Sequence, residues 1–373
     1  MVSQRNRSFD SLRGIFALMV VFTHIEYIRH NFSLPNHFFN PFFFHLGKIG
    51  VSGFFVLSGF LITGNLLREK DKPIAPASRK IRLFYLKRVL RIFPLYYLII
   101  FISIFLLPYI ESLHYFLPER VTDGRQIIQQ VAPYYYFLLP QVPLSQGIVL
   151  PFAEPAWSIG VEEMFYLLIP VCIYYARIKK NWLLFLSAVL VAVKLFYVFF
   201  VDRYYADHFL SLMALSRFEC IFMGCYAAFL VHEKHSVLEK INRKTIYLAL
   251  LLLLVCFVTL KRELFIYVHF SILFAVIILY LNKHKVSGME NRILSFLGKI
   301  SFSLYMTHEI VIVFFLNLEI FSDPRKYAPP LLYVLVLIFS IILGWLFYKV
   351  IEEPFIKIKD RLKVHASRKG SEN

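Results

Sequence analysis

The chain has 373 residues, of which 58% are hydrophobic and only 17% are charged, and its mean hydropathy is +0.62. Soluble domains usually carry about a quarter charged residues, so this composition excludes an ordinary soluble globular protein and indicates one that crosses a lipid bilayer several times. The formal net charge of +17 does not indicate a nucleic-acid partner, because the basic residues fall in alternate loops between apolar runs.

Apolar stretches predict about ten transmembrane helices, because a helical span needs about 20 apolar residues. In chain order they lie at 9–30, 47–66, 93–110, 157–176, 182–201, 214–232, 245–260, 264–282, 297–317 and 330–350. The first stretch is not followed by a small-residue cleavage site, so we expect a retained span. The predicted fold class is an all-α polytopic membrane protein, with a transmembrane domain over 1–355 and a basic cytoplasmic tail over 356–373.

The basic residues also predict the orientation of the chain in the membrane. Most of the 41 lysine and arginine residues fall in 1–13, 67–92, 177–180, 232–244, 283–299 and 349–369. The positive-inside rule assigns these segments to the cytoplasm, and ten spans then put both termini there. On the opposite side, the long segment 111–156 is aromatic and apolar, which predicts a re-entrant or interfacial stretch that could cover a cavity.

Arg13 and His24 share one face of the first predicted span, eleven residues or about 16 Å apart along the helix axis. Ionisable groups inside hydrocarbon usually mark a pathway or a reacting centre. A histidine titrates near neutrality, which suits it to take a proton from a hydroxyl or to carry an acyl group. The alternative is a histidine that only makes a hydrogen bond between helices.

Two arginines stand at the cytoplasmic start of the third predicted span. The sequence "LKRVLRIFP" places Arg88 and Arg91 three residues apart on one helical face. Their planar guanidinium groups suit a bidentate grip on phosphates. Ordinary anchoring to anionic lipid predicts the same pattern, so both interpretations stay open.

A polar stripe opens the span in "PAWSIGVEEMFYLLIP", where Ser158, Glu162 and Tyr166 follow at intervals of four residues. Glu162 could orient a histidine or polarise a hydroxyl, or it could pair with a basic group near the lipid headgroups.

In "GKISFSLYMTHEIV", Tyr305 and His308 share a helical face, and Glu309 adds a carboxylate beside them. Such a polar face must meet the bundle interior or a wet cavity.

Small residues recur in "GVSGFFVLSGFLITG", including Gly53, Gly59 and Gly64. They allow close helix packing, and they could also clear a channel for a narrow substrate. We favour packing, because small residues commonly form the contacts between membrane helices.

Six segments occur in the order "FDSLRGIFALMVVFTHI", "GVSGFFVLSGFLI", "RVLRIFPLYY", "AWSIGVEEMFYLL", "GKISFSLYMTHEIV" and "IEEPFIKI". Together they resemble the acyltransferase-3 family of membrane acyltransferases over nearly the whole chain. The resemblance implies an integral membrane enzyme that moves an acyl group, usually acetyl from acetyl-CoA, onto a hydroxyl of a cell-surface polysaccharide or a lipid-linked sugar.

The resemblance also implies site residues. It makes His24 the catalytic histidine with Arg13 as its basic companion, and Arg88 and Arg91 the family's Arg-x-x-Arg. The remaining matched positions are Trp157, Ser158, Glu162, Tyr305 and His308. This chain has Ser52 where many relatives carry an acidic residue. Many members also carry a C-terminal esterase-like domain that finishes the transfer. This sequence stops shortly after the last predicted span, so we expect the membrane domain to reach its acceptor directly or through a separate transferase partner.

The resulting hypothesis is acyl-CoA-dependent O-acylation across a bacterial cytoplasmic membrane, with acetyl-CoA or another acyl-CoA as donor and no metal. His24 acts as general base or transient acyl carrier, and Glu162 orients it. The arginines bind donor phosphates, and four residues line the route or stabilise the oxyanion: Tyr305, His308, Ser158 and Trp157. The alternative is a transporter or flippase for a small anionic or lipid-linked substrate, which would leave acyl-CoA intact.

Overall fold

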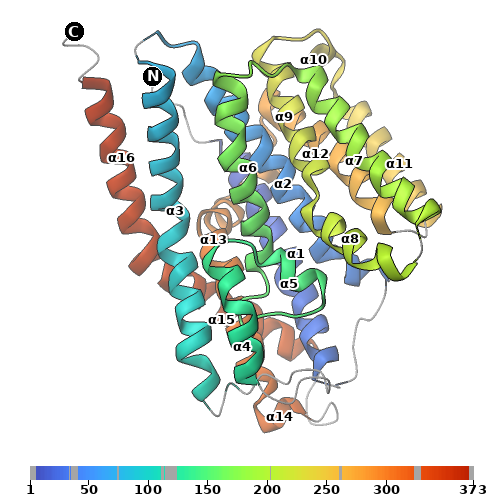
Figure 1. Ribbon diagram of the computed structural model, residues 1–373, viewed down its shortest axis with the longest axis vertical. Helices are drawn as coiled ribbons and strands as arrows, with labels where there is room; N and C mark the ends of the chain where they lie inside the picture. The colour runs from blue at the N-terminus through green and yellow to red at the C-terminus, as the bar shows by residue number, and fades with distance from the viewer. Residues whose placement is uncertain are drawn as a thin grey trace. The chain divides into compact units, whose positions relative to one another are not determined.

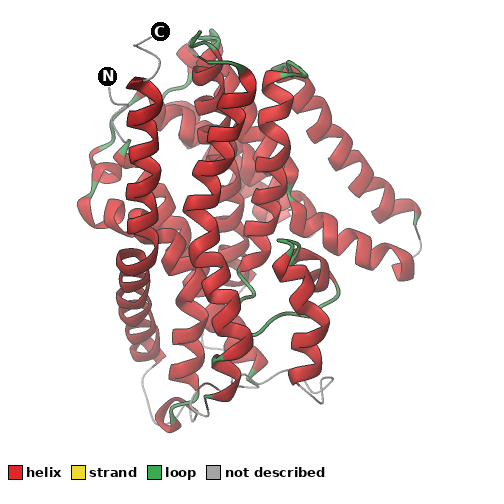
Figure 2. Ribbon diagram, turned by 60° about the vertical axis from the view of Figure 1, so that its left-hand side comes forward, coloured by secondary structure: helices red, strands yellow, loops and turns green. Residues whose placement is uncertain are grey.

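The computed structural model describes residues 6–32, 34, 41–73, 75–110, 113, 124–201, 203–259, 263–322 and 329–368. Within these ranges every regular element is a helix, and there is no strand (Figures 1 and 2). Eight helical stretches in the described residues are long and apolar enough to cross a membrane: Arg7–Asn31, His45–Lys70, Ala77–Tyr109, Ala156–Tyr174, Lys180–Phe200, Phe209–His232, Arg292–Leu316 and Pro330–Arg361. The predicted all-α polytopic membrane fold is therefore confirmed.

Every one of the ten predicted spans coincides with a helix. The helices, in chain order, are α1 (Arg7–Asn31), α2 (Pro41–Lys70), α3 (Ala77–Phe105), α6 (Ala156–Tyr174), α7 (Lys180–Phe200), α9 (Phe218–His232), α11 (Arg243–Thr259), α12 (Glu263–Lys283), α13 (Arg292–Leu316) and α15 (Pro329–Phe347). Two of them, α11 and α12, are not among the eight long spans. Within the described residues, the apolar stretch found in α12 is Tyr267–Lys283.

Helix α3 begins at Ala77, sixteen residues before the predicted start of the third span at residue 93. Its first half, "ASRKIRLFYLKRVLRIF", is rich in arginine, lysine and leucine, which favour helix, and it contains no glycine or proline. Arg88 and Arg91 therefore lie on one continuous helix with the predicted span that follows them, as their helical spacing predicts.

The predicted span 214–232 is interrupted near its start. Helix α8 (Arg203–Ser216) ends there, and α9 begins at Phe218. Arg217 between them has a φ of 41°, in the left-handed region that non-glycine residues rarely adopt. The chain changes direction at this arginine, a break that the apolar pattern alone does not reveal.

The C-terminal part of the chain stays helical beyond the last predicted span. Helix α15 continues through a π-helical turn, Tyr348–Glu352, into α16 (Glu353–Arg368). The predicted tail over 356–373 thus begins inside α16, and its residues 369–373 lie outside the described part of the chain.

Much of the segment 111–156 is described, although 111–112 and 114–123 lie outside the described residues. It forms two short helices, α4 (Gly124–Tyr136) and α5 (Gln141–Ser145). Tyr135 of α4 is buried, its hydroxyl accepts a hydrogen bond from the Leu150 amide at 3.1 Å, and its carbonyl accepts one from the Tyr96 hydroxyl at 2.9 Å. These bonds fix the segment against α3.

The chain divides into two compact units. Unit 1 comprises 1–12, 51–85 and 161–295, and unit 2 comprises 13–50, 86–160 and 296–373. In unit 1, α2 and α9 approach so closely that a Cβ at Gly59 would overlap the carbonyl oxygen of Ile221. This contact supports the packing role expected for the small residues of α2.

Candidate active site

Two histidines from helices far apart in the sequence meet in unit 2. Nδ1 of His24, on α1, lies 2.7 Å from Nε2 of His308, on α13, and the two rings stack with centroids 4.8 Å apart. His308 is fully buried, and the His24 side chain is 16% exposed. Two neutral rings at this distance share one proton, which one ring donates and the other accepts.

The carboxylate beside this pair is Glu309. Its Oε1 lies 3.9 Å from Nδ1 of His24, and its Oε2 accepts a hydrogen bond from the backbone amide of Glu154 at 3.3 Å. Glu309 is only 1% exposed, so its interaction with a protonated imidazole is little screened by water. The arrangement can stabilise positive charge that develops on His24.

Glu154, in the irregular segment before α6, is a further buried carboxyl group of this site. Burial raises the pKa of the Glu154 carboxyl from 4.5 to about 7. Helical spacing in the sequence does not indicate Glu154, because this residue belongs to no helical stripe. The one feature of the sequence that could have indicated Glu154 is that it is an acidic residue within the otherwise uncharged stretch "LPFAEPAW".

Ser158 and Tyr305 form a second hydrogen-bonded pair in unit 2. The Ser158 Oγ lies 2.8 Å from the Tyr305 hydroxyl and donates to the Pro155 carbonyl at 3.2 Å. Because that donation uses the serine proton, the tyrosine is the donor to Ser158. The Tyr305 ring centroid is 6.0 Å from that of His308. Ser158 and its neighbour Trp157 are both buried at the start of α6.

Glu162 belongs to unit 1. It accepts a hydrogen bond from the Tyr166 hydroxyl at 2.6 Å, and that hydroxyl lies 3.0 Å from the Ser58 hydroxyl of α2. Two members of the predicted polar stripe are thus hydrogen-bonded to each other one turn apart. The carboxylate that the structure brings to His24 is Glu309, and the orienting role of Glu162 stays a prediction.

The arginines expected to bind the donor are all in unit 2. Arg88 lies one turn before Arg91 on α3. Because Arg13 and His24 stand on one unbroken helix, the cationic group and the histidine pair are separated by about three helical turns, or about 16 Å along α1.

A profile of the acyltransferase-3 family, described as "Acyltransferase domain", matches residues 6–349. The chain belongs to this family. As a member with many apolar helices, it is a multi-pass membrane protein.

Named relatives are similar to this acyltransferase-3 chain at low identity. A Staphylococcus aureus (strain COL) protein with a provisional O-acetyltransferase name is 24% identical over 366 residues, covering 93% of this chain and 57% of its own length. The peptidoglycan O-acetyltransferase OatA of Listeria monocytogenes serovar 1/2a (strain ATCC BAA-679 / EGD-e) is 30% identical over 190 residues, 49% of this chain and 26% of that protein.

The O-acetyltransferase OatA of Staphylococcus aureus (strain NCTC 8325 / PS 47) is 24% identical over 333 residues, 83% of this chain and 53% of that protein. The chain spans about half the length of two of these curated relatives and a quarter of the third. No solved structure matches it.

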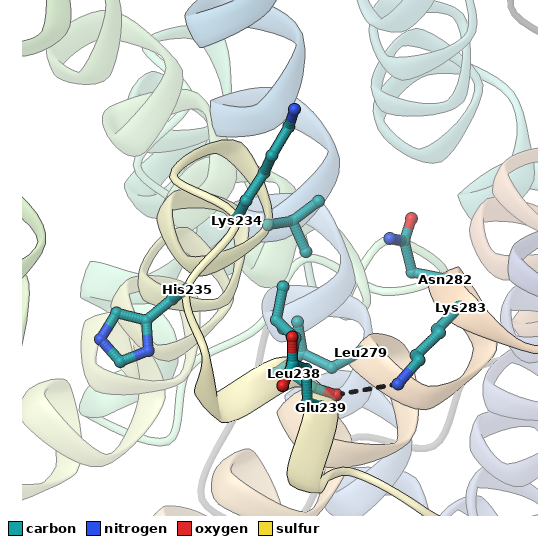
Figure 3. Close-up of a pocket in the computed structure, with 8 residues that line it drawn as sticks. Lys234, His235, Leu238, Glu239, Leu279, Asn282 and Lys283 are labelled. Atoms are coloured by element: carbon teal, nitrogen blue, oxygen red, sulfur yellow. Dashed lines mark hydrogen bonds between the residues drawn. The ribbon is translucent and has the colours of Figure 1, made fainter.

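The acyltransferase-3 chain also has a concavity in unit 1, with a volume of about 310 Å³ (Figure 3). Its apolar floor comes from Val231, Leu238 and Leu279. At its edge the ammonium group of Lys283 donates to the Leu238 carbonyl at 3.3 Å, while the His235 ring points away from that contact. The concavity contains none of the predicted site residues.

Proposed function

We propose that this chain is a membrane O-acetyltransferase that moves acetyl from acetyl-CoA in the cytoplasm to a hydroxyl of a cell-surface glycan, across a bacterial cytoplasmic membrane. The observation that carries the proposal is the contact between His24 and His308 with Glu309 beside it. The name of the Listeria relative makes peptidoglycan the first acceptor to test.

The histidine pair supports general base catalysis by His24. When Nδ1 of His24 donates to Nε2 of His308, Nε2 of His24 keeps a lone pair that can accept the proton of the acceptor hydroxyl. The hydroxyl oxygen then bonds to the acetyl carbon, the carbon–sulfur bond breaks, and the proton passes from the imidazolium to the leaving thiolate. Glu309 stabilises the imidazolium in between.

The arrangement of α1 supports a donor that enters from the cytoplasm. Arg13, with Arg88 and Arg91 of α3, binds the phosphates of the donor, and the thioester end reaches toward His24. The separation of about 16 Å along the helix is comparable to the length of an extended pantetheine arm. This topology requires the cytoplasmic orientation that the basic loops predict.

The hydrogen-bonded hydroxyls of Tyr305 and Ser158, next to Trp157, support a second part of the mechanism. We assign them to the route of the acceptor or to the oxyanion that forms when the hydroxyl attacks, toward which one of the two hydroxyls would redirect its proton from its present partner. A separate transferase partner that receives the acetyl group belongs to the same proposal.

The test uses membranes that contain the protein, radiolabelled acetyl-CoA and isolated peptidoglycan or another surface glycan. We expect label on the glycan with the wild type, and a loss of about 10²-fold or more with His24→Ala. His235→Ala, which changes an exposed histidine of unit 1, is the matched control. Undiminished label with His24→Ala contradicts the assignment, and intact acetyl-CoA after incubation indicates transport instead.

A further inference from the structure

The irregular segment 150–154 supplies a backbone donor to the carboxylate beside His24. The amide of Glu154 donates to Oε2 of Glu309 at 3.3 Å, while Oε1 of the same carboxylate lies 3.9 Å from Nδ1 of His24. Glu309 is only 1% exposed, so its carboxylate needs donors from the protein rather than from water. The amide thus holds one carboxylate oxygen and leaves the other toward the imidazole.

The segment begins with a tight turn. The amide of Ala153 donates to the carbonyl of Leu150 at 3.1 Å. Pro151 is the second residue of this turn, and Phe152, the third, has a φ of 64°. In a type II turn that third position usually belongs to glycine. A phenylalanine stays there only where its surroundings hold it, and Phe152 is fully buried. Backbone strain of this kind is typical of functional sites.

Tyr135 of α4 holds the first residue of the turn. Its hydroxyl accepts a hydrogen bond from the Leu150 amide at 3.1 Å. Its carbonyl accepts one from the Tyr96 hydroxyl of α3 at 2.9 Å. All three residues are buried and belong to unit 2. A series of buried hydrogen bonds and one short turn therefore joins α3 to the carboxylate that faces His24.

The neighbouring residue Tyr97 provides a natural comparison. Its hydroxyl donates to the carbonyl of Tyr136 at 3.0 Å, so the same two helices are joined by the same kind of bond one residue along. That bond is exposed, whereas the bond between Tyr96 and Tyr135 is buried. The buried bond ends on the residue that also binds Leu150.

The position of the Glu309 carboxylate matters because its proposed task is electrostatic. A carboxylate stabilises a developing imidazolium best when it already points at the ring, since no reorganisation is then needed during the reaction. A displacement of about 1 Å can cost up to about 10²-fold in rate. In an apolar interior, hydrogen bonds are strong enough to prevent such a displacement.

We propose that Tyr135 is a positioning residue for the chemistry at His24. Through the turn at 150–154 it holds the Glu154 amide in place. That amide aims the Glu309 carboxylate at the imidazole. The chemistry rests on the proposed function, whereas the series of hydrogen bonds is a feature of unit 2 that can be tested without activity.

The first measurement follows hydrogen exchange by mass spectrometry in peptides that cover 150–156, with the purified full chain in phosphatidylcholine nanodiscs. Tyr135→Phe keeps the ring and removes the hydroxyl that receives the Leu150 amide. We expect exchange of this segment to become about tenfold faster. Tyr97→Phe, the matched control, removes one hydroxyl between the same two helices and should change the rate by less than about twofold.

The second measurement is acetyl transfer per folded molecule. Tyr135→Phe should lower kcat about tenfold and change KM for acetyl-CoA by less than about twofold, because the carboxylate acts in the transition state. Tyr97→Phe should keep both values within about twofold of the wild type. In a Glu309→Gln background the effect of Tyr135→Phe on kcat should shrink to less than about twofold, since the hydroxyl acts through that carboxylate.

Equal exchange rates or equal kcat values for Tyr135→Phe and Tyr97→Phe overturn the positioning role. The same loss of kcat with and without Glu309→Gln also overturns it, because Tyr135 would then act on the fold alone. If Tyr135→Phe fails to fold, Tyr96→Phe decides the question in both measurements, with changes of about threefold expected. A wild type that transfers no acetyl group contradicts the proposed function, and hydrogen exchange then still supports or overturns the anchoring by Tyr135.

Discussion

Each unit buries a cluster of polar side chains in its apolar interior. The two clusters differ in how many of their polar atoms have a hydrogen-bond or ion-pair partner. The ion-pair cluster of unit 1 comprises Lys194, Glu219, Arg217, Ser52 and Tyr267. The ammonium group of Lys194 lies 2.5 Å from the Glu219 carboxylate, and both side chains are 3% exposed. The Arg217 guanidinium lies 3.9 Å from the centre of the Tyr267 ring and donates to the Ser52 hydroxyl at 3.2 Å.

The histidine cluster of unit 2 comprises His24, His308, Glu309 and Glu154. Its two rings share one proton between Nδ1 of His24 and Nε2 of His308. Oε1 of Glu309 faces His24 at 3.9 Å, beyond hydrogen-bond distance. This cluster therefore keeps capacity to gain or lose a proton.

The comparison separates a buried ion pair, which we expect to stabilise the fold, from buried titratable groups, which react under the proposed function. An ion pair with well-aligned hydrogen bonds has little to offer a substrate, since moving its proton would leave an unpaired charge in a low-dielectric interior. A pair of imidazoles can pass a proton between two neutral forms without that penalty. Changes in the ion-pair cluster should affect stability, and changes in the histidine cluster should affect activity.

The largest effect is expected from breaking the ion pair in unit 1. Lys194→Met leaves Glu219 buried without its cation, which should lower the free energy of unfolding by about 3–5 kcal/mol. Denaturant-induced unfolding of the purified protein in detergent measures this difference. Activity per folded molecule should stay near that of the wild type.

The double variant Lys194→Met/Glu219→Leu is the control for that experiment. Removing both charges and replacing them with apolar side chains of similar volume is often neutral for stability. We therefore expect the double variant to recover most of the loss. A double variant as unstable as Lys194→Met would mean that packing, and not charge, accounts for the effect.

The next largest effect concerns the histidine pair. His308→Gln replaces the ring that shares a proton with His24 by an amide, which still forms hydrogen bonds but does not titrate. Acetyl transfer should fall about 10²-fold, the lower end of the usual contribution of general acid–base catalysis. The free energy of unfolding should change by no more than about 1 kcal/mol.

His232→Gln serves as its control, because His232 pairs with Asp71 at 2.7 Å in a solvent-accessible part of unit 1. We expect full transfer activity from this variant. If His308→Gln were as active as the wild type, the contact between the two rings would be structural. The histidine cluster would then stabilise the fold, as we expect of the ion-pair cluster.

The positions of the spans and of several site residues could be predicted from the sequence. Apolar runs determine where a helix can cross a membrane, and helical spacing put Tyr305 and His308 on one face of α13. Spacing within one helix does not reveal which face meets which neighbour. The sequence therefore did not indicate that Oε1 of Glu309 lies 3.9 Å from Nδ1 of His24. The expected role of Glu162 in orienting His24 stays a prediction.

Other features have no periodic signal at all. Glu154 lies in an irregular segment, and its place in the site depends on how the chain folds back before α6. The break at Arg217 interrupts an apolar run without a glycine or a proline. Both features depend on tertiary contacts, which override local propensity.

A third prediction concerns the pH dependence of the free energy of unfolding, which we expect to arise from Glu154 in the histidine cluster. Its pKa is raised to about 7, from an ordinary value of 4.5, because the carboxyl is buried. The folded state then keeps this proton to a higher pH than the unfolded chain does, so stability is greatest at low pH and falls as the pH rises toward 7. Between pH 5 and 8 the loss should be about 2 kcal/mol.

Glu154→Gln removes the titrating group, so the decline in unfolding free energy between pH 5 and 8 should shrink by that amount. Unfolding at both pH values in the same detergent measures it. The Lys194→Met variant, which leaves Glu154 in place, should keep the full decline. An unchanged decline in Glu154→Gln would mean that other groups produce the pH dependence.

The smallest effect separates packing from charge within unit 1. A Cβ at Gly59 of α2 would overlap the Ile221 carbonyl oxygen of α9, whereas a Cβ at Gly64 would meet only the Cβ of Ala228 at 3.9 Å. Gly59→Ala should lower the free energy of unfolding by about 1–2 kcal/mol, and Gly64→Ala should leave it nearly unchanged. Ser52 lies on α2, and α9 begins directly after Arg217. Moving these two helices apart would therefore weaken the hydrogen bond between Arg217 and Ser52 in the ion-pair cluster. Acetyl transfer per folded molecule should nevertheless stay constant in both variants, since the histidine cluster lies in unit 2.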